Sequence, residues 1–228
     1  MDWSAVVAIA SRDARAGLRN RWFILYAIVF LVLSVGFSWV ALAGTELTGQ
    51  AGFGRTSAGL LNLMLLMVPL IGLTIGAQAI VSDRQDRSLE YLLAQPVSPA
   101  EVYVGKYLGA AFSLVVLLVF GFGWAGVMLA LRGAVGSPGD FILLVVLTVL
   151  LGLGMLSVGY LISSFSPQTA AALGIAVSLW LVFVIIGDLG LMGSSLVMRL
   201  QPSTLLMATL MNPLDTYKIG RASCRERV

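Results

Sequence analysis

Uncharged apolar stretches restrict the fold of this chain more than any other feature. Five windows contain no Asp, Glu, Lys or Arg, and they cover residues 22–43, 58–81, 107–131, 141–165 and 168–187. A helix needs about 20 mostly apolar residues to cross the hydrocarbon core of a bilayer. Composition agrees, because 59% of the residues are hydrophobic and 11% are charged, against about 45–50% and about 25% in soluble domains. We therefore expect an all-α polytopic membrane protein with five spans.

Composition also excludes many activities. The chain has no histidine and one cysteine, which removes imidazole catalysis, Cys-x-x-Cys redox pairs and the usual zinc sites. We expect no enzyme activity in this chain, no cofactor and no nucleic-acid partner. The windows also lack the intramembrane carboxylate that ion-driven carriers commonly use. Energy for any transport is therefore expected to enter from outside the bilayer.

Basic residues in the connections predict the orientation. One set precedes the first window or lies between the second and third, namely Arg12, Arg15, Arg19, Arg21, Arg84, Arg87 and Lys106. The connections on the other side hold only Arg55, Arg132, Arg199 and Lys218. Because Lys and Arg are enriched in cytoplasmic loops, we place the amino terminus in the cytoplasm.

Residues 1–21 are expected to form a helix on the cytoplasmic membrane surface, in contact with lipid. Apolar residues recur near helical spacing at Trp3, Val6, Val7, Ala10, Ala14 and Leu18, with Arg12, Arg15 and Arg19 on the other side. This amphipathic pattern is typical of interfacial helices. The alternative is a positively charged anchor that only sets topology.

Small residues at four-residue spacing predict close helix packing. They are Gly72 with Gly76, Gly105 with Gly109, and the set Ala170, Gly174 and Ser178. Such residues let helix backbones approach closely, within one bundle or across a dimer face.

The connection 82–101 is the most informative segment. Ser82 with Gln85 has the spacing of a capping box, and Ser98-Pro99-Ala100-Glu101 has the same spacing with proline at the first helical position. Between them, Leu89, Leu92 and Leu93 share one face of a short helix that Pro96 ends. This amphipathic helix suits a groove on a cytoplasmic protein. The alternative is an ordinary loop at the membrane surface.

These residues resemble a known family. Leu89-Glu90-Tyr91-Leu92-Leu93, Pro96-Val97-Ser98, Glu101 and Gly105-Lys106 look like the coupling region of ABC-2 type transporter permeases. Gly17 to Trp22 is similar to that family's entry into the first span. Arg87-Ser88 departs from the pattern, because many relatives have Gly-Thr there.

The resemblance implies a transport subunit that hydrolyses nothing itself. The ATPase of such a transporter is a separate subunit, and this chain lacks a Gly-x-x-x-x-Gly-Lys-Ser/Thr loop. It implies export driven by ATP, a location in the bacterial inner membrane, a homodimer of permeases, lipid contact and six spans, of which this chain shows five. The residues expected to contact the ATPase are Arg84, Arg87, Leu89, Glu90, Leu92, Leu93 and Glu101.

Within the family, the chain is similar to the NosY-like subfamily of membrane subunits. Gly17 to Trp22, the glycine-rich first outer loop and Asn212-Pro213-Leu214-Asp215 carry this likeness. It implies a role in maturing the copper centres of nitrous oxide reductase, with a periplasmic accessory protein. The alternatives are an exporter of lipid, drug or peptide, and a membrane scaffold that transports nothing.

Two features lie near the end of the chain. Met207 and Met211 stand one helical turn apart, and soft thioethers can bind Cu(I), although methionine is more often a flexible packing residue. Residues 219–228 hold three arginines and the only cysteine, and they are similar to a translated sequencing adapter. We therefore expect the transmembrane domain to be 22–218 and the tail 219–228 to be an artefact.

Overall fold

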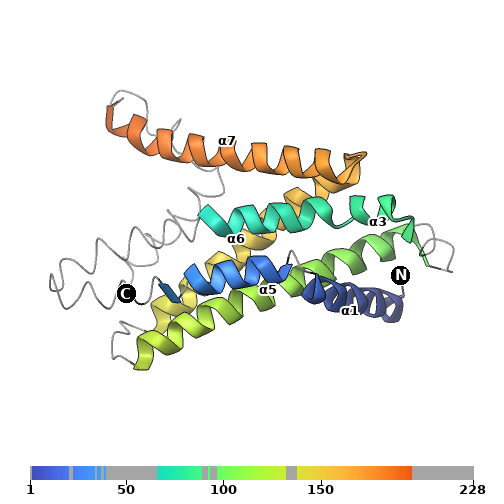
Figure 1. The fold of residues 1–228 in the computed structure, drawn as a ribbon, viewed down its shortest axis with the longest axis horizontal. Coiled ribbons are helices and arrows are strands. Elements are labelled where there is room, and N and C mark those ends of the chain that lie inside the picture. Colours follow the sequence, from blue (N-terminus) through green and yellow to red (C-terminus); the bar gives the residue numbers. More distant parts are fainter. Residues whose placement is uncertain are drawn as a thin grey trace.

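The computed structural model describes residues 2–20, 23–33, 35–36, 39, 66–88, 92, 97–131 and 138–196. Within these ranges the regular elements are all helices (Figure 1). They are α1 (Trp3–Arg19), a helix at Phe23–Leu33, a helix at Leu66–Gln85 that ends in α3 (Val81–Gln85), α5 (Pro99–Leu131), α6 (Pro138–Phe165) and α7 (Thr169–Leu196).

The expected all-α membrane architecture is confirmed for the described part. Three helices are long and apolar enough to cross a membrane, Leu66–Gln85, Pro99–Trp124 and Phe141–Phe165. A fourth span results if α1 and Phe23–Leu33, which meet at 64°, are counted together, and Thr169–Ile185 is a shorter apolar helix. Each of the five predicted windows therefore contains an apolar helix.

The third span begins earlier than its uncharged window indicates. We expected it from residue 107, whereas α5 is continuous from Pro99. Glu101 and Lys106 lie in its first two turns, and both are buried by contacts within the chain. A window defined by the absence of charge stops at such residues, although the helix does not.

Two apolar clusters hold the bundle together. The larger joins Phe23–Leu33, Leu66–Gln85, α5 and α6, and it includes an edge-to-face pair of Phe30 and Phe122 with ring centroids 5.5 Å apart. The smaller joins Leu66–Gln85, α6 and α7 through residues such as Leu73, Met155 and Ala176. Leu66–Gln85 and α6 contribute to both clusters, and together they connect α7 to the rest of the bundle.

Glycines set how closely Leu66–Gln85 and α6 approach. A Cβ built on Gly72 would stand 2.7 Å from the Gly152 carbonyl oxygen, and one on Gly76 would stand 2.8 Å from the Tyr160 nitrogen. From the other side, a Cβ on Gly159 would stand 3.0 Å from the Ala77 nitrogen. The close approach predicted at Gly72 and Gly76 is therefore confirmed, and it lies within one chain.

The second glycine pair receives α1. A Cβ on Gly105 would stand 2.9 Å from Ile9 Cβ, and one on Gly109 would stand 2.8 Å from the Ala10 carbonyl oxygen. The third set behaves differently, because Gly174 has open space around it. Four-residue spacing thus indicated close packing at two of three places.

The predicted amphipathic helix at the start of the chain is confirmed as α1, but its buried face is rotated from the expected one. Val6, Ile9 and Ala14 are buried, whereas Trp3 and Val7 are exposed. The buried residues face α5 through the groove at Gly105 and Gly109. One face of α1 therefore packs on α5 of the same chain, and Trp3 and Val7 are exposed on the neighbouring face.

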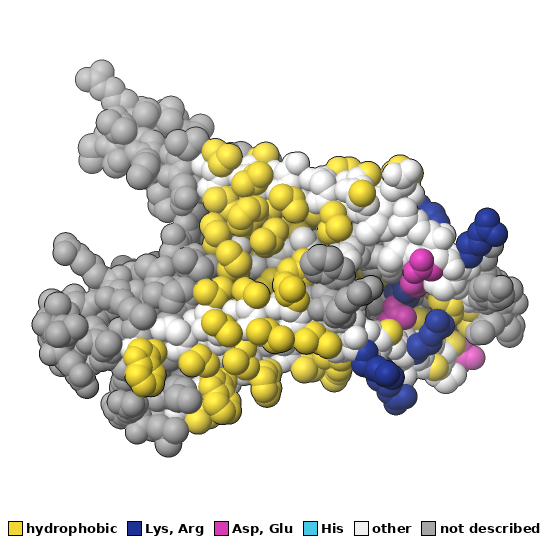
Figure 2. Space-filling model, in the orientation of Figure 1, with side chains coloured by type: hydrophobic (Ala, Val, Ile, Leu, Met, Phe, Trp, Pro, Cys, Tyr) yellow, Lys and Arg dark blue, Asp and Glu magenta, His cyan; other side chains and the backbone are white. Residues whose placement is uncertain are grey.

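The charged side chains that the structure describes gather at one end of the molecule. Figure 2 shows apolar side chains across the middle of this face, with Lys, Arg, Asp and Glu collected beyond them. Figure 1 places α1, α3 and the turn between α6 and α7 at that same end. This separation is the one expected of a helical bundle in lipid.

Candidate functional site

The site is built on α3, the last five residues of Leu66–Gln85, which a break separates from the rest of that helix. Residues 79 and 80 form a turn, so the helical hydrogen-bond ladder is interrupted there. The Ser163 hydroxyl of α6 accepts hydrogen bonds from the backbone N–H groups of Ile80 and Val81, each at 3.0 Å. Ser163 is fully buried. The break is therefore satisfied by a side chain of a neighbouring helix, which fixes where α3 begins.

The capping box predicted at Ser82 and Gln85 is wrong. The helix cap of α3 is Ile80, and Ser82 instead donates to the Gln78 carbonyl oxygen at 2.6 Å, one turn back. Gln85 accepts a hydrogen bond from Thr169. The sequence spacing was misleading because the chain enters α3 from a preceding helix and not from an extended segment.

The capping box predicted at Ser98 and Glu101 is confirmed. The Glu101 N–H donates to Ser98 Oγ at 3.3 Å, and the Ser98 N–H donates to Glu101 Oε2 at 2.9 Å. α5 then begins at Pro99. The other carboxylate oxygen of Glu101 accepts the Asp2 N–H at 2.7 Å. Glu101 therefore joins the start of α5 to the start of α1.

A three-residue ion cluster lies behind α3. Lys106 of α5 is 4% exposed, and its ammonium group donates to Asp13 of α1 at 2.7 Å and to Asp83 of α3. Three elements far apart in the sequence meet at this one ammonium group. The sequence indicated Lys106 as a topological charge and as part of the family resemblance, but not as the centre of an ion cluster. The available signal was Asp13, the one acidic residue between Arg12 and Arg21 in a basic segment.

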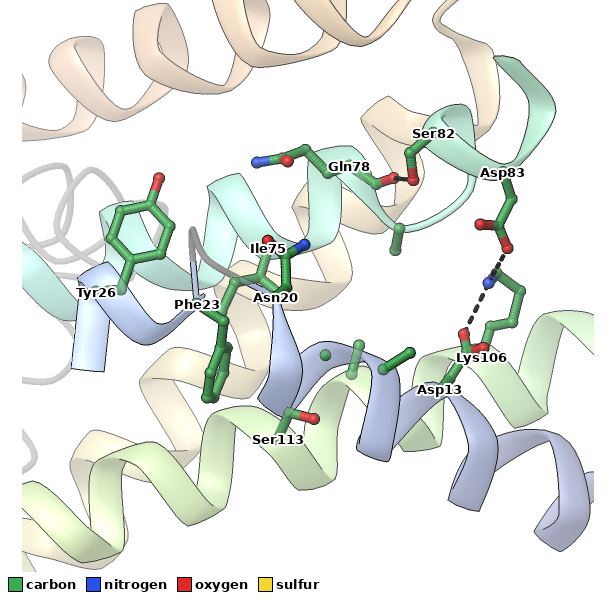
Figure 3. A pocket seen from close by; sticks show the side chains of 14 residues that line it. Asp13, Asn20, Phe23, Tyr26, Ile75, Gln78, Ser82, Asp83, Lys106 and Ser113 are labelled. Atoms are coloured by element: carbon green, nitrogen blue, oxygen red, sulfur yellow. Dashed lines mark hydrogen bonds and ion pairs between the residues drawn. The ribbon is translucent and has the colours of Figure 1, made fainter. Parts of the chain in front are cut away.

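Lys106 separates two cavities. One, of about 230 Å³, opens between α1, Phe23–Leu33, Leu66–Gln85 and α5. Figure 3 shows Phe23 and Tyr26 towards one end of it and the ion cluster towards the other. The second, of about 270 Å³, lies between α3, α5 and α6. The first includes Asp13, Asp83 and Lys106 in its lining, and it is large enough to admit water, so water can reach the ion cluster.

The structure places four of the seven predicted contact residues. Arg84 donates to the carbonyl oxygens of Ser166 and Ser164, each at 3.2 Å. Arg87 is exposed, whereas Leu92 and Glu101 are buried. Leu89, Glu90 and Leu93 lie outside the described residues, as do Met207, Met211 and the tail 219–228.

Arg87 has an unusual backbone. Its φ is +56°, the left-handed region, and within the described ranges it is the one non-glycine residue with a positive φ. This region costs a residue with a Cβ about 1–2 kcal/mol. The Gly-Thr expected here from the family resemblance would place glycine at this position, and glycine adopts such a φ freely. The departure noted in the sequence thus coincides with a strained position.

The fold and the charged end define a multi-pass helical membrane protein in which α3 is tied to the neighbouring helices by side-chain contacts. Residues 7–227 match the sequence model of the ABC-2 family transporter proteins. The chain belongs to this family of transporter permeases.

Two relatives show which members of the ABC-2 family this chain resembles. The chain is 33% identical over 220 residues to the probable ABC transporter permease protein NosY of Pseudomonas aeruginosa, covering 94% of this chain and 80% of the relative. It is 30% identical over 217 residues to the protein of the same name from Stutzerimonas stutzeri, covering 92% and 79%. The chain is therefore a NosY-like ABC-2 permease.

Proposed function

We propose that this permease couples ATP hydrolysis by a separate ABC ATPase subunit to export across the inner membrane. The observation that carries the proposal is the family match over residues 7–227, since ABC-2 permeases work with such a subunit. The concentration of charge at the end that holds α3 supports contact on that side (Figure 2). Basic residues at that end support its location in the cytoplasm, because Lys and Arg are enriched in cytoplasmic connections.

The segment after α3 is the proposed ATPase contact. Arg87 is exposed, and Leu89, Glu90 and Leu93 follow it in the sequence. Arg84, Leu92 and Glu101 are engaged within the chain by hydrogen bonds or burial. We therefore assign the direct contact to Arg87, Leu89, Glu90 and Leu93, and we assign the other three residues to holding the segment in place.

Copurification of the co-expressed ATPase with the full-length permease tests this contact. Arg87→Glu should reduce the recovered ATPase strongly, because reversing a charge at an interface places like charges together. Arg87→Gly is the matched control, since glycine suits the φ of +56° and adds no negative charge. Equal recovery of the ATPase with Arg87→Glu and with the unchanged permease would reject the assignment.

The NosY-like character supports a narrower proposal. We propose that the transporter acts as two permease copies with a periplasmic accessory protein in maturing the copper centres of nitrous oxide reductase. Its support is 33% and 30% identity to two permeases named NosY. Deleting the gene should leave nitrous oxide reductase synthesised but poor in copper. Normal copper content in the enzyme from the deletion strain would instead favour export of a lipid, drug or peptide.

A further inference from the structure

Three consecutive residues of α3 reach three different parts of the bundle. Asp83 accepts from Lys106 of α5, which also donates to Asp13 of α1 at 2.7 Å. Arg84 donates to the Ser164 and Ser166 carbonyl oxygens at the end of α6. Gln85 accepts from Thr169, the first residue of α7. We call Asp83, Arg84 and Gln85 the clasp.

Helix geometry explains how neighbours in sequence can do this. Successive residues of an α-helix point about 100° apart, so three of them cover more than half of the circumference. Figure 1 shows α3 between α7 on one side and α5 with α1 on the other. Asp83 therefore serves the α1 and α5 side, while Arg84 and Gln85 serve the turn between α6 and α7.

The contacts made by Arg84 are well suited to a stable connection. The last carbonyl oxygens of a helix have no partner within that helix. Arg84 donates to one of them, that of Ser164, and to the carbonyl oxygen of Ser166 directly after the end of α6. Both distances are 3.2 Å. A guanidinium group offers several donors in a fixed planar arrangement, so it can hold both carbonyl groups at once.

The break before α3 gives this short helix an orientation of its own. The turn at residues 79 and 80 separates it from the rest of Leu66–Gln85, and Ser163 holds both N–H groups freed there. A force applied beyond Gln85 therefore acts first on α3 and its side-chain contacts. Those contacts lead to α1, α5, α6 and α7.

We propose that Asp83 and Arg84, with Gln85, are positioning residues that carry a displacement of α3 to two sides of the bundle separately. Asp83 carries it through Lys106 to α5 and α1, and Arg84 with Gln85 carries it to α6 and α7. This inference rests on the proposed function, because the displacement comes from the ATPase. Neither Asp83 nor Gln85 was among the residues that the sequence singled out for coupling.

The test uses the full-length permease with its ATPase in membranes. Cys224→Ser removes the one cysteine of the chain, and single reporter cysteines replace Val127 of α5 or Ile185 of α7, both exposed and far from α3 along their helices. The measured quantity is the rate of thiol labelling with and without ATP. An ATP-dependent change of about fivefold or more is expected for coupled sites.

Variants on the two sides of the clasp should affect different reporters of the ATP-dependent labelling change. Arg84→Ala should reduce the ATP-dependent change at residue 185, where the contact of Gln85 with Thr169 remains, and it should retain the change at residue 127. Asp83→Ala should abolish the change at residue 127 and retain it at residue 185. Arg84→Lys keeps the charge but not the fork of donors, so it should restore part of the change at residue 185. Asp86→Asn, a change at an exposed neighbour, is the control and should alter neither reporter.

Failure of the clasp and failure of ATPase coupling would give different labelling results. ATPase should copurify with the unchanged permease and with both clasp variants. If ATP alters neither reporter in the unchanged complex, the proposed coupling itself fails, and the clasp fails with it. If ATP alters both reporters equally in the Arg84→Ala and Asp83→Ala variants, coupling stands and the clasp is rejected. If either variant lost the ATP-dependent change at both residue 127 and residue 185, the two sides would not receive the displacement separately, and the clasp would also be rejected.

Discussion

At the scale of single residues, the strain at Arg87 leads to a stability prediction. Arg87→Gly should raise the free energy of unfolding by up to about 1 kcal/mol, because relief of the left-handed strain exceeds the entropic cost of glycine. Denaturant titration in detergent micelles measures this. Asp86→Gly is the matched control, since Asp86 has a φ of −79°, and it should lower stability. A lower stability for Arg87→Gly as well would contradict the strain.

Lys106 is the residue whose loss should cost most at this end. Lys106→Met leaves Asp13 and Asp83 facing each other without their shared cation, and breaking a buried ion pair costs about 3–5 kcal/mol. Both carboxylates are partly exposed, so we expect the lower part of this range. Asp13→Asn retains the contact of Lys106 with Asp83 and should cost about 1 kcal/mol. Similar stabilities for the two variants in a denaturant titration would show that the cluster does not act as a unit.

At the scale of helices, the approach of Leu66–Gln85 to α6 depends on glycine. Gly159→Ala places a methyl group 3.0 Å from the Ala77 nitrogen, and such overpacking costs about 1–3 kcal/mol. Gly154→Ala, on the same helix with open space around it, should be neutral or stabilising by up to about 1 kcal/mol. The free energies of unfolding of the two variants check this. Equal losses in the two variants would mean that the close contact at Gly159 does not decide the effect.

The sequence predicted the helices and one helix start, but not the contacts between distant helices. Apolar windows predicted the helices, and the spacing of Ser98, Pro99 and Glu101 predicted where α5 begins, because both signals are local. The Ser82 capping box failed, since its partners depend on the helix before it. The cluster of Asp13, Asp83 and Lys106 was missed because it joins residues up to 93 positions apart, and charge pairing at that separation leaves no periodic pattern.

At the scale of the whole molecule, the orientation can be tested across a single helix. α6 runs from Pro138 to Phe165 with a mean hydropathy of 2.8 over its apolar part, so its two ends should lie on opposite sides of the membrane. In a Cys224→Ser background, Gly139→Cys should react with an impermeant thiol reagent added to intact spheroplasts. Gln168→Cys, at the end that carries α3, should react only after permeabilisation, because the positive-inside rule places that end in the cytoplasm. Labelling in the opposite order would invert the proposed orientation and move the clasp away from any cytoplasmic ATPase, and labelling of both in intact spheroplasts would mean that α6 does not span the membrane.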